Sequence, residues 1–237
     1  TAQRSKAFLW APDGNAYYSA EGNEILKYSL PKFEKTVLLD AKALTPANAT
    51  KPLNVKNVSV QANEQLFLIY TNTQKVWRYE TRGDYWVYNK AKNSLTQLGK
   101  KLPEASLMFA KLSPDGKKAA YVSKHNIYVE DLASGTIKQL TKDGTDRVIN
   151  GTFDWVYEEE FGCRDGFRWN PDSKSIAYWQ IDARKIRNFL MINTTDSIYS
   201  YTIPVEYPKV GEDPSACKIG VVDVLTGFSK WMKVPGS

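Results

Sequence analysis

The stretch that decides the fold is residues 109–141, which read FAKLSPDGKKAAYVSKHNIYVEDLASGTIKQLT. Proline presets the second position of a turn and glycine accepts positive φ, so the Pro-Asp-Gly sequence at 114–116 predicts a tight turn. Short runs rich in β-branched and aromatic residues follow, separated by turn-forming segments at 124–126 and 133–135. The pattern predicts four short strands joined by tight turns, which make one antiparallel blade of a β-propeller.

The turn phrase of residues 112–116 recurs along the chain. Further copies lie at residues 10–14 and 169–173, and a degenerate copy lies at 60–64. The copies start roughly fifty residues apart, within the period of propeller blades. We therefore predict an all-β fold with about four four-stranded antiparallel blades, at residues 6–40, 57–98, 108–141 and 167–234.

Three long insertions interrupt the predicted blades. Residues 73–84 join the second and third strands of blade two, residues 145–166 join blades three and four, and residues 183–216 join the second and third strands of blade four. In a four-stranded meander, all three connections emerge at the same end of the blades. We expect the functional site on that rim, because a scaffold with its long loops on one face usually carries its site there.

Composition excludes several classes of protein. The 237 residues are 42% hydrophobic and 24% charged, which is ordinary for a globular chain that buries a sizeable core. The net charge of +6 comes from scattered lysines and arginines, so we expect no nucleic-acid partner. No stretch approaches the ~18 apolar residues of a membrane span, and no signal peptide opens the chain at Thr1. We interpret that start, almost directly before a strand, as the boundary of a fragment.

The residues needed for metal, cofactor or nucleophilic chemistry are missing from the sequence. Cys163 and Cys217 are too few for a disulfide framework and lack metal spacing, and whether they form one bridge is left open. The single histidine, His125, falls in a predicted tight turn, and there is no G-x-S-x-G elbow or glycine-rich phosphate motif. We expect no metal, no cofactor and no catalytic triad within these residues.

Residues 154–161, DWVYEEEF, place three adjacent carboxylates among aromatic side chains, an arrangement that favours a receptor for a cation. Neighbours on a strand point to opposite faces, so Glu159 and Glu160 converge only if this segment is a helical turn. Such a pair offers its oxygens to an ammonium group, with roughly 1.5–3 kcal/mol for each sheltered charge-assisted bond. A general acid–base pair is disfavoured, because no nucleophile or histidine accompanies the glutamates.

Three segments resemble the dipeptidyl peptidase IV family of serine exopeptidases. Residues 154–160 resemble its D-W-x-Y-E-E-E signature, and residues 77–88 resemble its W-R-x-S/E-Y/T…Y segment. Residues 203–214 resemble its Y-P-K-x-G-x-x-N-P turn, with Asp213 in the usual asparagine position. An Asp-Pro pair still initiates a turn, so we interpret the last segment as loop architecture without functional contact.

The resemblance implies roles for three side chains. Glu159 and Glu160 would hold the free amino terminus of a peptide, and Arg78 would contact a peptide carbonyl. The structural alternative for Arg78 is a hairpin arginine stacked on aromatic rings. For the glutamates it is a solvated face, or pairing with Arg164 and Arg168.

The resemblance also implies a larger enzyme. In the family, an eight-bladed propeller gates a separate α/β-hydrolase domain that carries serine, aspartate and histidine, which would lie beyond Ser237. The chain alone would then be inactive, and its parent would release N-terminal dipeptides ending in proline or alanine. The family also implies an extracytoplasmic location, periplasmic or on the cell surface.

The expected partners are a peptide with a free amino terminus, the hydrolase domain, and a second copy of the chain, since an incomplete propeller exposes the apolar faces of its end blades. The alternative function is a non-enzymatic propeller that binds a protein or a carbohydrate. It explains the repeats equally well but leaves the acidic segment and Arg78 as coincidences.

Overall fold

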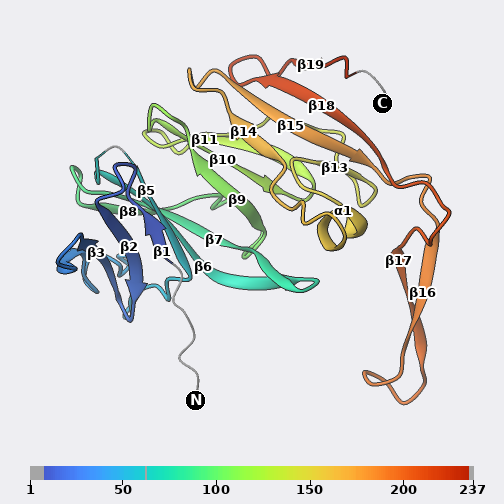
Figure 1. Cartoon of the computed structure of the whole chain (residues 1–237), viewed down its shortest axis with the longest axis horizontal. Helices are drawn as coiled ribbons and strands as arrows, with labels where there is room; N and C mark the ends of the chain where they lie inside the picture. Colours follow the sequence, from blue (N-terminus) through green and yellow to red (C-terminus); the bar gives the residue numbers. More distant parts are fainter. Residues whose placement is uncertain (1–7, 62, 235–237) are drawn as a thin grey trace. The chain divides into compact units, whose positions relative to one another are not determined.

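The computed structural model describes residues 8–61 and 63–234 (Figure 1). The chain divides into two compact units. The first holds the residues up to Leu112 together with 116–119 and 130–135, and the second holds residues 113–115, 120–129 and those from Thr136 onward. Lys6 and Ala7 of predicted blade one, and Ala62 in the degenerate turn, lie outside the described residues.

The first unit is built from antiparallel strands that pair in chain order. One sheet has the order β1-β2-β3-β4, and a second group has the order β5-β6-β7-β8. Its core includes Ile25, Leu44, Phe67 and Ile69, all inaccessible to solvent. The strands are β1 (Phe8–Trp10), β2 (Ala16–Glu21), β3 (Glu24–Ser29), β4 (Glu34–Leu39), β5 (Asn57–Gln61), β6 (Leu66–Val76), β7 (Tyr79–Asn89) and β8 (Ser94–Gln97).

A third group of strands follows in the same antiparallel meander. It comprises β9 (Leu107–Leu112), β10 (Lys118–Ser123), β11 (Asn126–Asp131) and β12 (Ile137–Gln139), which neighbour one another in chain order. Their residues are divided between the two units. Ala119, Ala120, Tyr121 and Val122 of β10 are fully buried, as a continuous apolar run predicts.

The sheet of the second unit is organised around β15 (Ser175–Asp182). One edge of β15 pairs along its whole length with β18 (Ala216–Asp223), which pairs in turn with β19 (Ser229–Trp231). Two short strands share the other edge of β15. β14 (Phe167–Trp169) pairs with residues 176–178, and β13 (Val148–Asn150) pairs with residues 180–182.

Between β15 and β18 the chain forms a separate two-stranded sheet. β16 (Asn188–Asn193) and β17 (Tyr201–Glu206) pair along their full lengths and project from the ends of β15 and β18 as a long hairpin (Figure 1). The helix of the second unit, α1 (Trp155–Glu159), lies between β13 and β14 in the chain.

The all-β class with antiparallel sheets is confirmed. The turn chemistry behind the prediction is also confirmed, because Gly14 and Gly116 adopt φ of 71° and 67°, the left-handed conformation that glycine tolerates best. Three features differ from expectation. β9 pairs with β7 through residues 107–108 and 82–83, which joins the strands of predicted blades two and three at that point. Residues 73–84 are largely strand, since β6 and β7 continue to Val76 and from Tyr79, and β13 supplies an additional sheet strand within the insertion 145–166.

Several structural features are absent from the described part of the chain. Within residues 8–61 and 63–234, no helix is long and apolar enough to cross a membrane. In the same ranges, no group of three or more His, Cys, Asp or Glu residues is placed to hold a metal ion. Cys163 and Cys217 carry free thiols and are half-buried, so the bridge that the sequence left open is not formed.

We predict that Gly83→Ala destabilises the first unit. A methyl group at Gly83 would lie 2.6 Å from Cε2 of Tyr70 and 2.7 Å from the carbonyl oxygen of Thr71. Forcing an extra carbon into a packed site costs about 1–3 kcal/mol, so the urea midpoint should fall accordingly. Lys75→Ala, at an exposed position of β6, is the control and should leave the midpoint nearly unchanged. Equal midpoints for Gly83→Ala and the native chain would contradict this packing.

Candidate functional site

The acidic segment lies in a loop whose two ends are held together. The amide of Gly151 donates to the carbonyl of Trp179 (2.9 Å), and the amide of Trp179 donates to the carbonyl of Gly166 (2.9 Å). The amide of Gly166 also donates to the carbonyl of Gly151 (3.0 Å). Trp179 lies on β15 between the residues paired with β14 and those paired with β13. The loop therefore leaves the sheet and returns to it at one point, which we call the neck.

Local sequence explains why a helical turn forms inside this loop. Asp154 is a favoured N-cap residue, and its Oδ1 accepts a hydrogen bond from the amide of Tyr157 (3.2 Å). The amide of Glu158 donates to the carbonyl of Asp154, and that of Glu160 to the carbonyl of Val156. Glu160 itself has helical dihedrals, with φ of −93° and ψ of −37°. The segment thus forms the helical turn that the sequence analysis required for Glu159 and Glu160 to converge, with Glu159 as its last residue and Glu160 as its C-cap.

The three adjacent glutamates occupy different environments. Glu158 is buried, and its Oε1 lies 3.4 Å from Nε of Arg164. Arg164 also donates from Nη2 to the carbonyl of Glu158 (3.2 Å). Glu159 is half-buried and Glu160 is exposed. The first carboxylate therefore pairs inside the loop, the second is half-buried with Oε1 shielded from solvent, and the third lies at the surface.

Burial raises the pKa of Glu158 above its ordinary value, and the neighbouring Glu159 raises it further. Arg164 opposes both effects by favouring the charged carboxylate. Burial also raises the pKa of Tyr157 to about 12, with a hydrogen bond to Cys217 adding to the effect. The tyrosine hydroxyl therefore remains protonated and available as a donor at neutral pH.

A second segment, the connector of residues 207–215 between β17 and β18, contacts α1 directly. The hydroxyl of Ser215 donates to Oδ2 of Asp154, and the hydroxyl of Tyr157 donates to the carbonyl of Ser215 (3.1 Å). The ring of Tyr207 packs on that of Trp155, with centroids 4.4 Å apart. Within the second unit, the insertions 145–166 and 183–216 therefore lie side by side, as their shared rim predicts.

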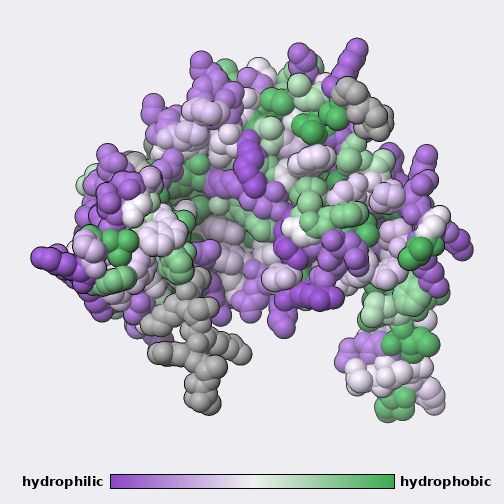
Figure 2. Space-filling view, viewed as in Figure 1, coloured by the Kyte–Doolittle hydropathy of each residue, from purple (hydrophilic) through white to green (hydrophobic). Residues whose placement is uncertain are grey.

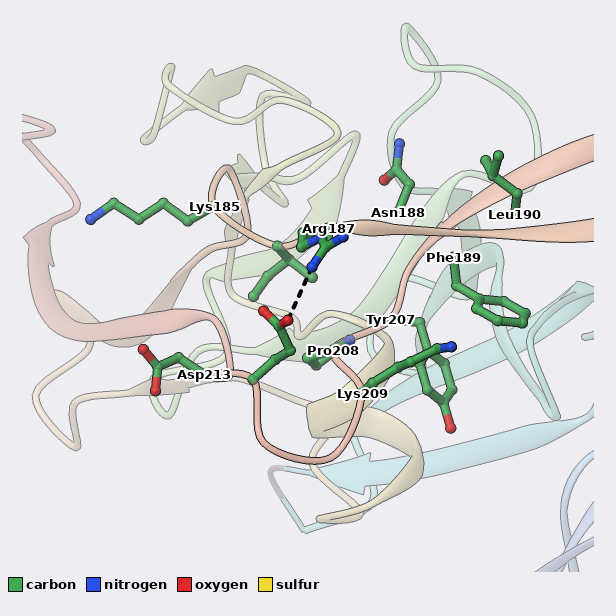
Figure 3. A pocket seen from close by; sticks show the side chains of 11 residues that line it. Lys185, Arg187, Asn188, Phe189, Leu190, Tyr207, Pro208, Lys209 and Asp213 are labelled. Carbon is green, nitrogen blue, oxygen red and sulfur yellow. Dashed lines mark hydrogen bonds and ion pairs between the residues drawn. The ribbon is translucent and has the colours of Figure 1, made fainter.

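A pocket of about 230 Å³ borders the connector at the base of the β16–β17 hairpin (Figure 3). The guanidinium of Arg187 pairs with Glu212 at 3.2 Å, and the ammonium of Lys209 lies 5.3 Å from the ring centroid of Phe189. Tyr207 belongs both to the pocket wall and to the contact with Trp155. The pocket thus shares one aromatic side chain with the support of α1, and two of its lining cations, Arg187 and Lys209, already have partners.

Arg78 lies in the first unit, at the tip of the hairpin formed by β6 and β7, and its side chain is exposed. Trp77 precedes it with a φ of 55°, which turns the chain between the two strands. The hydroxyl of Tyr70 donates to the carbonyls of Glu80 (2.9 Å) and Arg82 (2.8 Å). These bonds stiffen the hairpin two and four residues beyond Arg78.

The structure therefore joins two of the three predicted site residues in one helical turn and carries Arg78 on a separate unit. Of the pairings considered for the acidic run, Glu158 pairs with Arg164, whereas Arg168 pairs with Asp165 at 3.0 Å.

Ser215 was not identified from the sequence as a residue of this site. A lone serine after an Asp-Pro pair carries no local signal, because its partners lie far along the chain.

We predict that Arg164→Ala destabilises the second unit by about 1–3 kcal/mol near neutral pH, because it leaves the buried Glu158 carboxylate without its cation. Loss of Arg164 raises the pKa of Glu158 further, so the folded state binds a proton more readily than the unfolded chain. The penalty should therefore shrink as pH falls from about 7 towards the ordinary value of 4.5. Denaturant unfolding at several pH values measures it.

Arg168→Ala is the matched control for Arg164→Ala. Arg168 also pairs with an acid of the same loop, but its side chain is 64% exposed. Exposed pairs contribute about 0–1 kcal/mol, so this variant should lose little stability at any of these pH values. A penalty for Arg164→Ala that is equal to the control, or that grows as pH falls, would contradict the assigned ion pair.

Comparison with known proteins identifies relatives of the chain. The family model described as the dipeptidyl peptidase IV (DPP IV) N-terminal region matches residues 61–237. Dipeptidyl aminopeptidase B of Saccharomyces cerevisiae is 30% identical over 207 residues, covering 85% of this chain and 24% of that protein. Dipeptidyl peptidase 4 of Sus scrofa is 28% identical over 221 residues, covering 92% of this chain and 28% of that protein.

The fold has a close counterpart among solved structures. The crystal structure of Porphyromonas gingivalis dipeptidyl peptidase 4 superposes with a TM-score of 0.87 at 25% identity, covering 98% of this chain and 33% of that chain. The chain thus spans about a quarter to a third of the length of the relatives compared. Since the family model matches most of the sequence, the chain belongs to the dipeptidyl peptidase IV family and corresponds to its N-terminal region.

Proposed function

We propose that the chain is the part of a dipeptidyl peptidase IV-like serine exopeptidase that binds the free amino terminus of a peptide substrate. The strand groups β1–β4, β5–β8, β9–β12 and β14–β19 would be blades of an eight-bladed propeller completed by the rest of the protein. That propeller would admit peptides to an α/β-hydrolase domain carrying serine, histidine and aspartate. The peptidase names of the relatives in yeast and pig support the reaction class.

The observation that carries this proposal is the helical turn ending in Glu159 and Glu160. Consecutive helical residues diverge by about 100°, so their carboxylates can both reach one ammonium group, which strand neighbours cannot do. Glu158, by contrast, is buried against Arg164. The turn would therefore offer the carboxylates of Glu159 and Glu160 to the amino terminus, while Glu158 is balanced internally by Arg164.

Fixing the amino terminus would explain dipeptide release. The anchored ammonium sets the distance to the hydrolytic serine, and only a bond at that distance lies within reach of attack. Cleavage after the second residue follows if the distance matches two residues. The preference for proline or alanine at that residue would be set by the hydrolase domain.

Arg78 would contact a carbonyl of the bound peptide. Its guanidinium is a charged donor on a stiffened hairpin, a placement that suits recognition of a backbone oxygen. The support for this role is the exposure of Arg78 together with the double hydrogen bond from Tyr70 that fixes the flanking strand.

We predict that Glu159→Gln combined with Glu160→Gln in the full-length protein lowers kcat/KM for a glycyl-prolyl chromogenic amide on the order of a hundredfold or more. Each substitution removes a charge-assisted bond contributing roughly 1.5–3 kcal/mol. The control is Glu24→Gln with Glu34→Gln, which removes a half-buried carboxylate from β3 and an exposed one from β4. Retained activity in the first double variant, or equal loss in both, would refute the anchor.

We also propose that the full-length protein is a homo-oligomer that associates through the β16–β17 hairpin. Leu190, Met191 and Ile192 are at least half exposed, and the hairpin carries a visible hydrophobic surface (Figure 2). Both outer edges of this two-stranded sheet lack a neighbouring strand among the described residues. A second copy of the chain is the partner that fits these edges, because identical apolar strands are self-complementary about a two-fold axis.

An extracytoplasmic location is proposed on the family resemblance alone, and cell fractionation tests it.

We predict that Ile192→Lys shifts the full-length protein towards the monomer in sedimentation velocity at a fixed concentration. The side chain is 71% exposed, so its charge should oppose association without disturbing the fold. Leu225→Lys, at an 85% exposed position in the turn between β18 and β19, is the control and should leave the sedimentation coefficient unchanged. A native protein that is already monomeric, or an Ile192→Lys variant that sediments like the control, would overturn the proposal.

A further inference from the structure

We propose that Ser215 is a positioning residue for the amino-terminus anchor and acts through Asp154, the N-cap of α1. The inference rests on the function proposed above and deepens it. It assigns a role in substrate binding to a residue of the connector, which reaches the site only through α1.

The need for such a residue follows from the length of α1. The helix has five residues, and isolated helices shorter than about 12–15 residues are marginal in water. Tertiary contacts must therefore fix its orientation. The neck holds the two ends of the loop at Trp179, but α1 lies in the body of the loop and needs a second attachment.

Ser215 supplies that attachment with two hydrogen bonds. Its hydroxyl donates to Oδ2 of Asp154, and its carbonyl accepts from the hydroxyl of Tyr157 at 3.1 Å. The other oxygen of Asp154 accepts from the amide of Tyr157, so the two oxygens of the N-cap are divided between the connector and the helix. Asp154 and Ser215 are 7% and 3% exposed, which shelters the bond between them from competing water.

The position of Ser215 is itself well determined. It directly precedes Ala216, the first residue of β18, which pairs with Asp182 at the end of β15. The neck is attached to the same strand at Trp179. Both attachments of α1 are therefore fixed to β15 or to its neighbour β18. The ring of Tyr207, which packs at a tilt against Trp155, adds a third contact from the connector.

The consequence concerns the alignment of Glu159 and Glu160. These residues directly follow the part of α1 that Ser215 holds, so a rotation of the helix moves both carboxylates relative to the bound ammonium. Moving the carboxylates weakens their charge-assisted bonds to the ammonium equally in the ground state and in the transition state. Loss of the Ser215 hydroxyl should therefore raise KM while leaving kcat nearly unchanged.

The test compares Ser215→Ala and Ser215→Thr in the full-length protein, with glycyl-prolyl p-nitroanilide as substrate. We expect Ser215→Ala to raise KM about tenfold while kcat stays within about twofold of the native value. Threonine keeps the hydroxyl, so Ser215→Thr should restore KM to within about threefold. A purely structural role would lower the amount of folded enzyme and hence kcat, without this selective change in KM.

The matched control is Ser113→Ala. Ser113 belongs to the same unit, is fully buried, and donates from its hydroxyl to Oδ1 of Asp115 at 2.6 Å. This variant removes the same kind of serine–aspartate bond from a Pro-Asp-Gly turn. It should leave KM unchanged even if it lowers the thermal midpoint.

The proposal is overturned if Ser215→Ala keeps the native KM, if it lowers kcat alone, or if Ser113→Ala raises KM equally. If Ser215→Ala does not fold, Tyr157→Phe removes the other hydrogen bond to Ser215 while keeping the ring, and the same criteria for KM decide.

The double variant Glu159→Gln with Glu160→Gln separates the positioning role of Ser215 from the proposed amino-terminus anchor. If it loses activity while Ser215→Ala keeps the native KM, only the positioning role fails; if it keeps activity, the anchor itself is wrong.

Discussion

The acidic site depends on the three backbone hydrogen bonds of the neck, which join Gly151, Gly166 and Trp179. Backbone groups at the edge of a buried strand must find partners, and β13, the neck and β14 together supply them along β15. The two ends of a loop inserted at this point are fixed, because they complete the hydrogen-bond ladder of β15, which is paired on both edges. Gly166 permits the closure, since a methyl group there would lie 2.9 Å from Phe153 and 3.0 Å from the backbone of Gly151.

Three adjacent carboxylates pose an electrostatic problem that the loop solves by separating their environments. Burial disfavours the charged form of Glu158 and Glu159 adds repulsion, whereas Arg164 favours the charged form, and the pKa of Glu158 lies above its ordinary value. Glu158 is turned towards Arg164, whereas Glu159 is half-buried and Glu160 is exposed. The order of the three residues therefore places the first carboxylate against an internal cation and the last at the surface of the loop.

Local chemistry made parts of this structure predictable. The Pro-Asp-Gly phrases located the turns between strands, because positive φ at glycine is a property of a few consecutive residues. The helical turn at residues 155–159 was expected on the condition that Glu159 and Glu160 converge, since no strand lets adjacent side chains do so. The all-β class followed from the repeat of such units.

What escaped prediction depends on pairing between distant segments. β13 is a three-residue strand whose existence depends on β15, some thirty residues further on. The extension of β6 and β7 beyond Thr71 is secured by the hydroxyl of Tyr70, which bridges to the opposite strand. The bond from Ser215 to Asp154 links the connector to the helix cap across a separation that no sequence pattern marks. A helix as short as α1 has its direction set by such non-local contacts, so the placement of Glu159 and Glu160 depends on the whole β15-centred sheet.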